Sequence, residues 1–86
     1  MKVAVYDTHV AKKDDETIHF NIVVPNGSSY EKVIEFGKAY LKRVGQEGQP
    51  LSAKECKFCH TEQPSSAVDE SIRAQGFHIV EMDGCR

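Results

Sequence analysis

Residues 17–45 read TIHFNIVVPNGSSYEKVIEFGKAYLKRVG, and this stretch decides the fold. In its first eight residues apolar and polar side chains largely alternate, which is the period of a β-strand with one buried face. The apolar residues of that face are Ile18, Phe20, Ile22 and Val24. The Pro-Asn-Gly sequence at 25–27 then predicts a turn at the end of the strand.

A helix is predicted directly after this turn. Ser28 and Glu31 have the spacing of a capping box, in which each residue satisfies a backbone N–H of the other at a helix start. Gly45 supplies the left-handed residue that ends many helices. Between them one stripe recurs at helical spacing: Tyr30, Val33, Ile34, Gly37, Tyr40, Leu41 and Val44.

The residues before this stretch predict a second strand, at 2–10, joined to the first by a charged hairpin loop at 11–16. The two strands are expected to be antiparallel. Their register stays open, because residues 2–10 are apolar on both faces and either face could point to the core.

Toward the C-terminus, residues 46–50 are a polar connector, and Ser65 and Ser66 open a shorter helix that Gly76 closes. Val68 and Ile72 form an apolar pair one turn apart in this helix. Residues 77–82 predict a last strand. Because both of its faces are apolar, we expect it inside the sheet.

Residues 55–62 allow a strand, a helix capped by Ser52 with Glu55, or a metal-binding turn. The strand is favoured, because a segment must cross back before the second helix. The chain is therefore expected to be one α+β domain over residues 1–86, with the order ββαβαβ. A four-stranded mixed sheet would pack with two helices, and the strand–helix–strand unit would make a right-handed parallel crossover.

Composition excludes several classes of protein. The chain has 86 residues, 40% of them hydrophobic and 28% charged, as in ordinary globular domains. A formal net charge of −2 gives no positive electrostatic potential that would attract the phosphate backbone, so no nucleic-acid partner is expected. The sequence has no signal-peptide core and no apolar run near membrane-spanning length. We expect a cytoplasmic protein without a membrane partner, and leave its protein or small-molecule partner open.

The sequence Cys-Lys-Phe-Cys-His at 56–60 is the first site candidate. Cys56 and Cys59 could ligate zinc with two further ligands from His60, Cys85 or His78. They could also cycle as a dithiol, attach haem, or simply be buried. One Cys-x-x-Cys supplies half of a zinc site, so Cys56, Cys59, His60 and Cys85 form a predicted metal site of middling specificity, with zinc as its metal.

A second candidate lies on the first hairpin. Asp7 and His9 share one strand face, and His19 follows across the loop. A carboxylate and an imidazole near one end of a sheet could bind a small ligand or exchange a proton. The simpler interpretation is a solvated polar group at a hairpin end.

Four strings, at residues 5–10 (VYDTHV), 19–25 (HFNIVVP), 54–60 (KECKFCH) and 81–85 (EMDGC), resemble a family of small bacterial proteins defined only as a domain of unknown function. The resemblance implies one domain that mixes helices with a sheet, and no activity. A binding or structural module with a thiol or metal site at Cys56 and Cys59 is therefore the favoured function. A thiol-based or Asp/His small-molecule enzyme is the alternative.

Overall fold

A long antiparallel hairpin forms the centre of the molecule in the computed structural model, which describes residues 1–84. Its strands are β1 (Val3–Ala11) and β2 (Thr17–Pro25). They pair from Val3 opposite Pro25 to Ala11 opposite Thr17. This register settles the face that the sequence left open, because the even-numbered residues of both strands point into the larger core.

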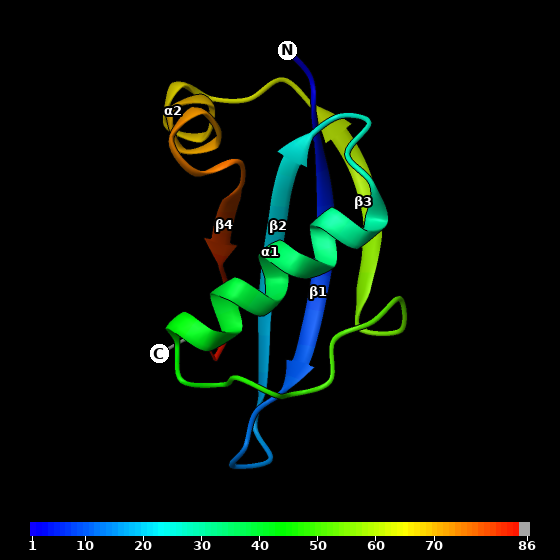
Figure 1. Cartoon of the computed structure of the whole chain (residues 1–86), viewed down its shortest axis with the longest axis vertical. Coiled ribbons are helices and arrows are strands. Elements are labelled where there is room, and N and C mark those ends of the chain that lie inside the picture. The colour runs from blue at the N-terminus through cyan, green and yellow to red at the C-terminus, as the bar shows by residue number, and fades with distance from the viewer. Residues whose placement is uncertain (85–86) are drawn as a thin grey trace.

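The sheet has four strands in the order β3-β1-β2-β4, with β3 (Cys56–Glu62) and β4 (His78–Glu81) at its edges. Together with two helices this is the expected α+β fold with the order ββαβαβ, and the strand at 56–62 is confirmed. The expectation of a mixed sheet is wrong, because every pairing is antiparallel. The segment after β3 carries the chain to the opposite edge of the sheet (Figure 1). There β4 pairs antiparallel with β2, so the strand–helix–strand unit makes no parallel crossover.

The placement of the last strand inside the sheet is also wrong. β4 pairs with β2 alone among the described strands, and Val80 is 36% exposed. Ile79, the other apolar residue of β4, is partly buried and packs against the larger core. A short edge strand can therefore show the same two-sided apolar pattern as an interior one.

Helix α1 (Tyr30–Arg43) covers one face of the sheet (Figure 1). Its N-cap is Ser29, whose side chain accepts a hydrogen bond from the Lys32 N–H. The predicted cap, Ser28, instead donates its hydroxyl hydrogen to the Pro25 carbonyl in the preceding turn. The buried face of α1 packs on the even-numbered side of the hairpin, and its buried members are Val33, Gly37, Tyr40 and Leu41.

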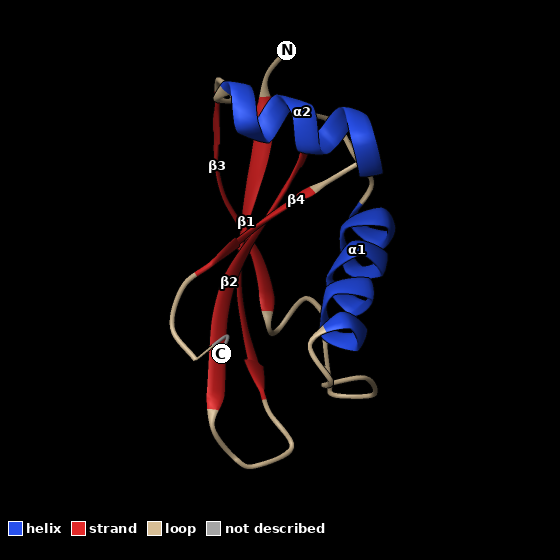
Figure 2. Ribbon diagram, turned by 90° about the vertical axis from the view of Figure 1, so that its left-hand side faces the viewer, coloured by secondary structure: helices blue, strands red, loops and turns tan. Residues whose placement is uncertain are grey.

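Helix α2 (Ser66–Gln75) lies across one end of the sheet and packs on the other face (Figure 2). Ser65 caps its start, and Gly76 ends it in the left-handed conformation, both as predicted. Ile72 and Val68 pack there against Val3, Val5 and Val23. The rest of that face carries no helix in the described chain (Figure 2). Neither described helix is long and apolar enough to cross a membrane.

Candidate functional site

The uncovered half of the second sheet face displays polar side chains. Strand alternation sends the odd-numbered residues of β1 and β2 to this face. Near α2 these residues are valines, which form the smaller core, whereas farther along the hairpin they become Asp7, His9, His19 and Asn21. The same alternation that buries the valines therefore leaves a polar group on open sheet.

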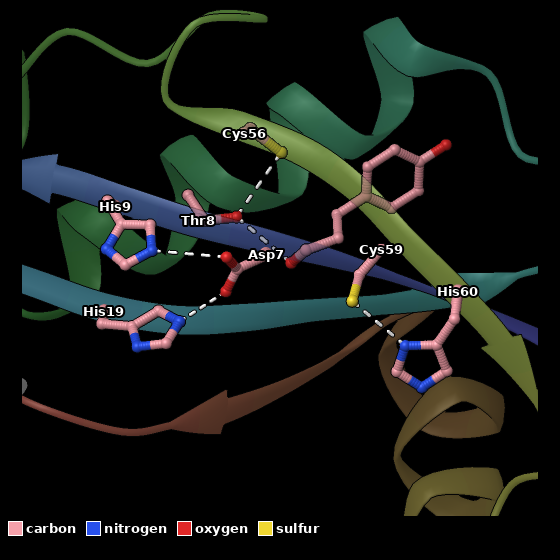
Figure 3. Close-up of polar contacts among 8 residues, drawn as sticks. Asp7, Thr8, His9, His19, Cys56, Cys59 and His60 are labelled. Atoms are coloured by element: carbon pink, nitrogen blue, oxygen red, sulfur yellow. Dashed lines mark hydrogen bonds and ion pairs between the residues drawn. The ribbon is translucent and has the colours of Figure 1, made fainter.

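Asp7, His9 and His19 converge at this point (Figure 3). Each offers one ligand atom, and these atoms all lie within 4.8 Å of one another. The Asp7 carboxylate contacts Nε2 of His9 at 3.3 Å through Oδ2, and Nε2 of His19 through Oδ1. His9 and His19 are directly opposite in the register, and their rings stack with centroids 4.1 Å apart. The expected placement of Asp7 and His9 on one strand face, with His19 across the loop, is confirmed, and the structure also brings the three together.

The two histidines also set the charge state of the carboxylate. The hydrogen bond from His19 lowers the pKa of Asp7 below its ordinary value, and the nearby His19 and His9 rings lower it further against the opposing effect of burial. Asp7 is therefore an anion at neutral pH. The stabilisation from this contact is lost only as the pH falls through the lowered pKa, and it is small because Asp7 is 42% exposed.

Asn21 is a neighbour that the sequence did not single out. It lies opposite Asp7 in the register, and its Oδ1 is buried without a hydrogen-bond partner in the described chain. Buried acceptors of this kind are uncommon in folded proteins. The signal was available in the sequence, because Asn21 is the polar residue of β2 that follows His19 on the same face.

The predicted cysteine site is divided between the two faces of the sheet. Cys56 is fully buried on the α1 side, where the hydroxyl group of Thr8 lies 3.5 Å from its Sγ. Burial raises the pKa of the Cys56 thiol, which keeps it neutral and a poor ligand. Cys59 is exposed and contacts His60 instead (Figure 3).

The three predicted ligands that the structure describes, Cys56, Cys59 and His60, do not converge as a group of three. Among the described residues, the His, Cys, Asp and Glu side chains that converge as a group of three are Asp7, His9 and His19. Cys85 lies outside the described residues. The Ser52–Glu55 pair, which suggested a helix start, closes a turn before β3, where the Glu55 carboxylate accepts from both the N–H and the hydroxyl of Ser52.

Comparison with known proteins identifies the family. A family model described as "Domain of unknown function (DUF2024)" matches residues 1–82. The chain belongs to the DUF2024 family. The NMR structure of protein NE1680 from Nitrosomonas europaea, a structural genomics target, is similar to this DUF2024 chain with a TM-score of 0.87 and 38% sequence identity, covering 100% of both chains. No curated protein matches the chain significantly. The expected resemblance to a bacterial family of unknown function is confirmed, and it brings no activity with it.

Proposed function

We propose that this protein binds a divalent transition-metal ion through Asp7, His9 and His19. The observation that carries the proposal is the convergence of one carboxylate and two imidazoles from neighbouring strands, with all ligand atoms within 4.8 Å of one another. Two histidines and one carboxylate are a ligand set that zinc and non-haem iron both accept.

The geometry needs only a small closing movement. Ligand atoms around zinc lie about 2.0–2.2 Å from the metal, which places neighbouring ligand atoms roughly 3–3.6 Å apart. Asp7 and His9 already meet that spacing at 3.3 Å. Because His9 is 53% exposed, its ring can turn without disturbing the core.

The placement of the three residues favours a metal site that binds a further small ligand over a purely structural metal site. Three protein ligands leave positions on the metal for water or a small molecule, as in catalytic rather than structural zinc sites. The sheet face that no described helix covers gives such a ligand access to the metal (Figure 2). We place the protein in the cytoplasm, where a reducing environment keeps the exposed Cys59 as a thiol.

Isothermal titration with zinc tests this function. We expect one zinc ion per chain to bind at pH 7.5, and binding to weaken as the pH falls, because protons compete with the metal for the imidazole nitrogens. Zinc at a free concentration of 100 times Kd should stabilise the folded protein by about 2.7 kcal/mol, and the unfolding temperature should rise accordingly. Absence of heat and of any thermal shift at neutral pH would refute the proposal.

A further inference from the structure

A second chemical group lies on β3, apart from the Asp7 cluster. Cys59 Sγ lies 3.2 Å from Nδ1 of His60, and Nε2 of the same ring lies 2.6 Å from Oε1 of Glu62. A thiol, an imidazole and a carboxylate thus follow one another in hydrogen-bond contact. This is the order of nucleophile, base and orienting group found in nucleophilic sites.

An irregularity in β3 builds this arrangement. In a regular strand, adjacent residues such as Cys59 and His60 would point to opposite faces. Here His60 pairs with Val5 and Phe58 pairs with Tyr6, so Cys59 is the extra residue of a β-bulge. The bulge brings Cys59 and His60 to the same side of β3 (Figure 3). Glu62 follows two residues later on the face of His60.

We propose that Cys59, His60 and Glu62 form a nucleophilic thiol site that exchanges with low-molecular-weight disulfides. His60 Nδ1 takes the proton from the Cys59 thiol, and Sγ attacks one sulfur of the disulfide. A new S–S bond joins Cys59 to that sulfur while the original S–S bond breaks. The departing thiolate takes the proton from His60. Cys59 is oxidised to a mixed disulfide, and the other half of the reagent is reduced to a thiol.

The surroundings of the thiol favour a disulfide over an acyl substrate. Acyl transfer needs hydrogen-bond donors arranged around a developing oxyanion and a site that excludes water. Cys59, His60 and Glu62 are all exposed. A groove between α1 and residues 47–51 lies elsewhere on the molecule. Thiol–disulfide exchange requires only an accessible thiolate and in-line approach to sulfur.

The fate of the product follows from the position of Cys56. A second thiol on the same face could resolve the mixed disulfide, but Cys56 is buried on the α1 side. Of the two cysteines that the structure describes, Cys56 therefore does not resolve the adduct on Cys59, and an external thiol removes it. Glu62 acts as a positioning residue, because its carboxylate accepts the Nε2 hydrogen and leaves Nδ1 free for the thiol proton.

Reaction of the intact protein with glutathione disulfide at pH 7, followed by peptide mass spectrometry, tests this site. We expect a glutathione adduct at Cys59 that dithiothreitol removes. His60→Ala should slow adduct formation at least about tenfold, and Glu62→Gln should slow it less while changing the ¹⁵N tautomer signals of His60. Thr61→Ala, between these residues but facing the other side, is the matched control and should react at the wild-type rate.

Two results would overturn the proposal. One is an equal rate of Cys59 modification in wild type and His60→Ala, with circular dichroism showing both folded. The other is a Cys59 rate no higher than that of the same cysteine in urea-unfolded protein. Neither result depends on metal binding, because the reaction is run with a chelator present.

Discussion

His19→Ala is expected to lower the affinity for zinc by about 100-fold or more. Loss of a hydrogen-bond partner behind a metal ligand typically costs about 10–100-fold in affinity, and removal of a direct ligand should cost at least as much. His19 offers its Nε2 as the ligand atom, and this nitrogen contacts Oδ1 of Asp7. Its removal leaves one imidazole and one carboxylate, which are too few for tight binding.

The matched control for this variant is His78→Ala. His78 lies on β4 and pairs with Val23 of β2, so it faces the same side of the sheet as His19. It does not belong to the converging group. We expect His78→Ala to bind zinc as the wild type does. If His78→Ala weakens binding as much as His19→Ala, or if His60→Ala abolishes binding while His19→Ala does not, the ligands are not those proposed.

Phe20→Ala is expected to destabilise the fold by about 3–5 kcal/mol. Phe20 is fully buried in the larger core, with its ring 4.6 Å from that of Tyr40 on α1. Its removal leaves a cavity between the sheet and the helix. Because domains of this size are typically stable by only about 5–15 kcal/mol, the variant should unfold at a much lower urea concentration.

Phe58→Ala provides a control with the same chemical change. Phe58 is 56% exposed on the edge strand β3, and its ring and that of Tyr6 form a T-shaped pair. We expect Phe58→Ala to lower the free energy of unfolding by less than about 1 kcal/mol. Surface substitutions usually change it by about 0.5 kcal/mol or less, and this one also removes the ring contact with Tyr6. Urea denaturation of both variants measures the difference. A loss for Phe58→Ala as large as that for Phe20→Ala would contradict the exposed position of Phe58 on β3.

The parts of the fold that the sequence predicts are those with local signals. Helix α1 has a complete apolar stripe and a glycine at its end, and α2 has a serine cap and Gly76. The order of strands in the sheet has no such local signal. Residues 77–82 are apolar on both faces, which an edge strand and an interior strand can share, and nothing in them reports which strand they pair with.

The same distinction explains the two sites. Asp7 and His9 were predictable neighbours of His19, because a short hairpin loop necessarily brings the ends of its two strands together. The position of Cys59 beside His60 was not predictable, because the bulge depends on how β3 aligns with β1. For the same reason the Cys-x-x-Cys spacing suggested two thiols in one site, whereas Cys56 and Cys59 point into different surroundings.

Anomalous diffraction from a crystal grown with zinc tests the metal site most directly, because it locates the ion without reference to affinity. We expect one anomalous peak about 2.0–2.2 Å from a nitrogen of His9, a nitrogen of His19 and an oxygen of Asp7. A peak instead at Cys59 and His60, or no peak within bonding distance of Asp7, His9 and His19, would contradict the proposed metal site.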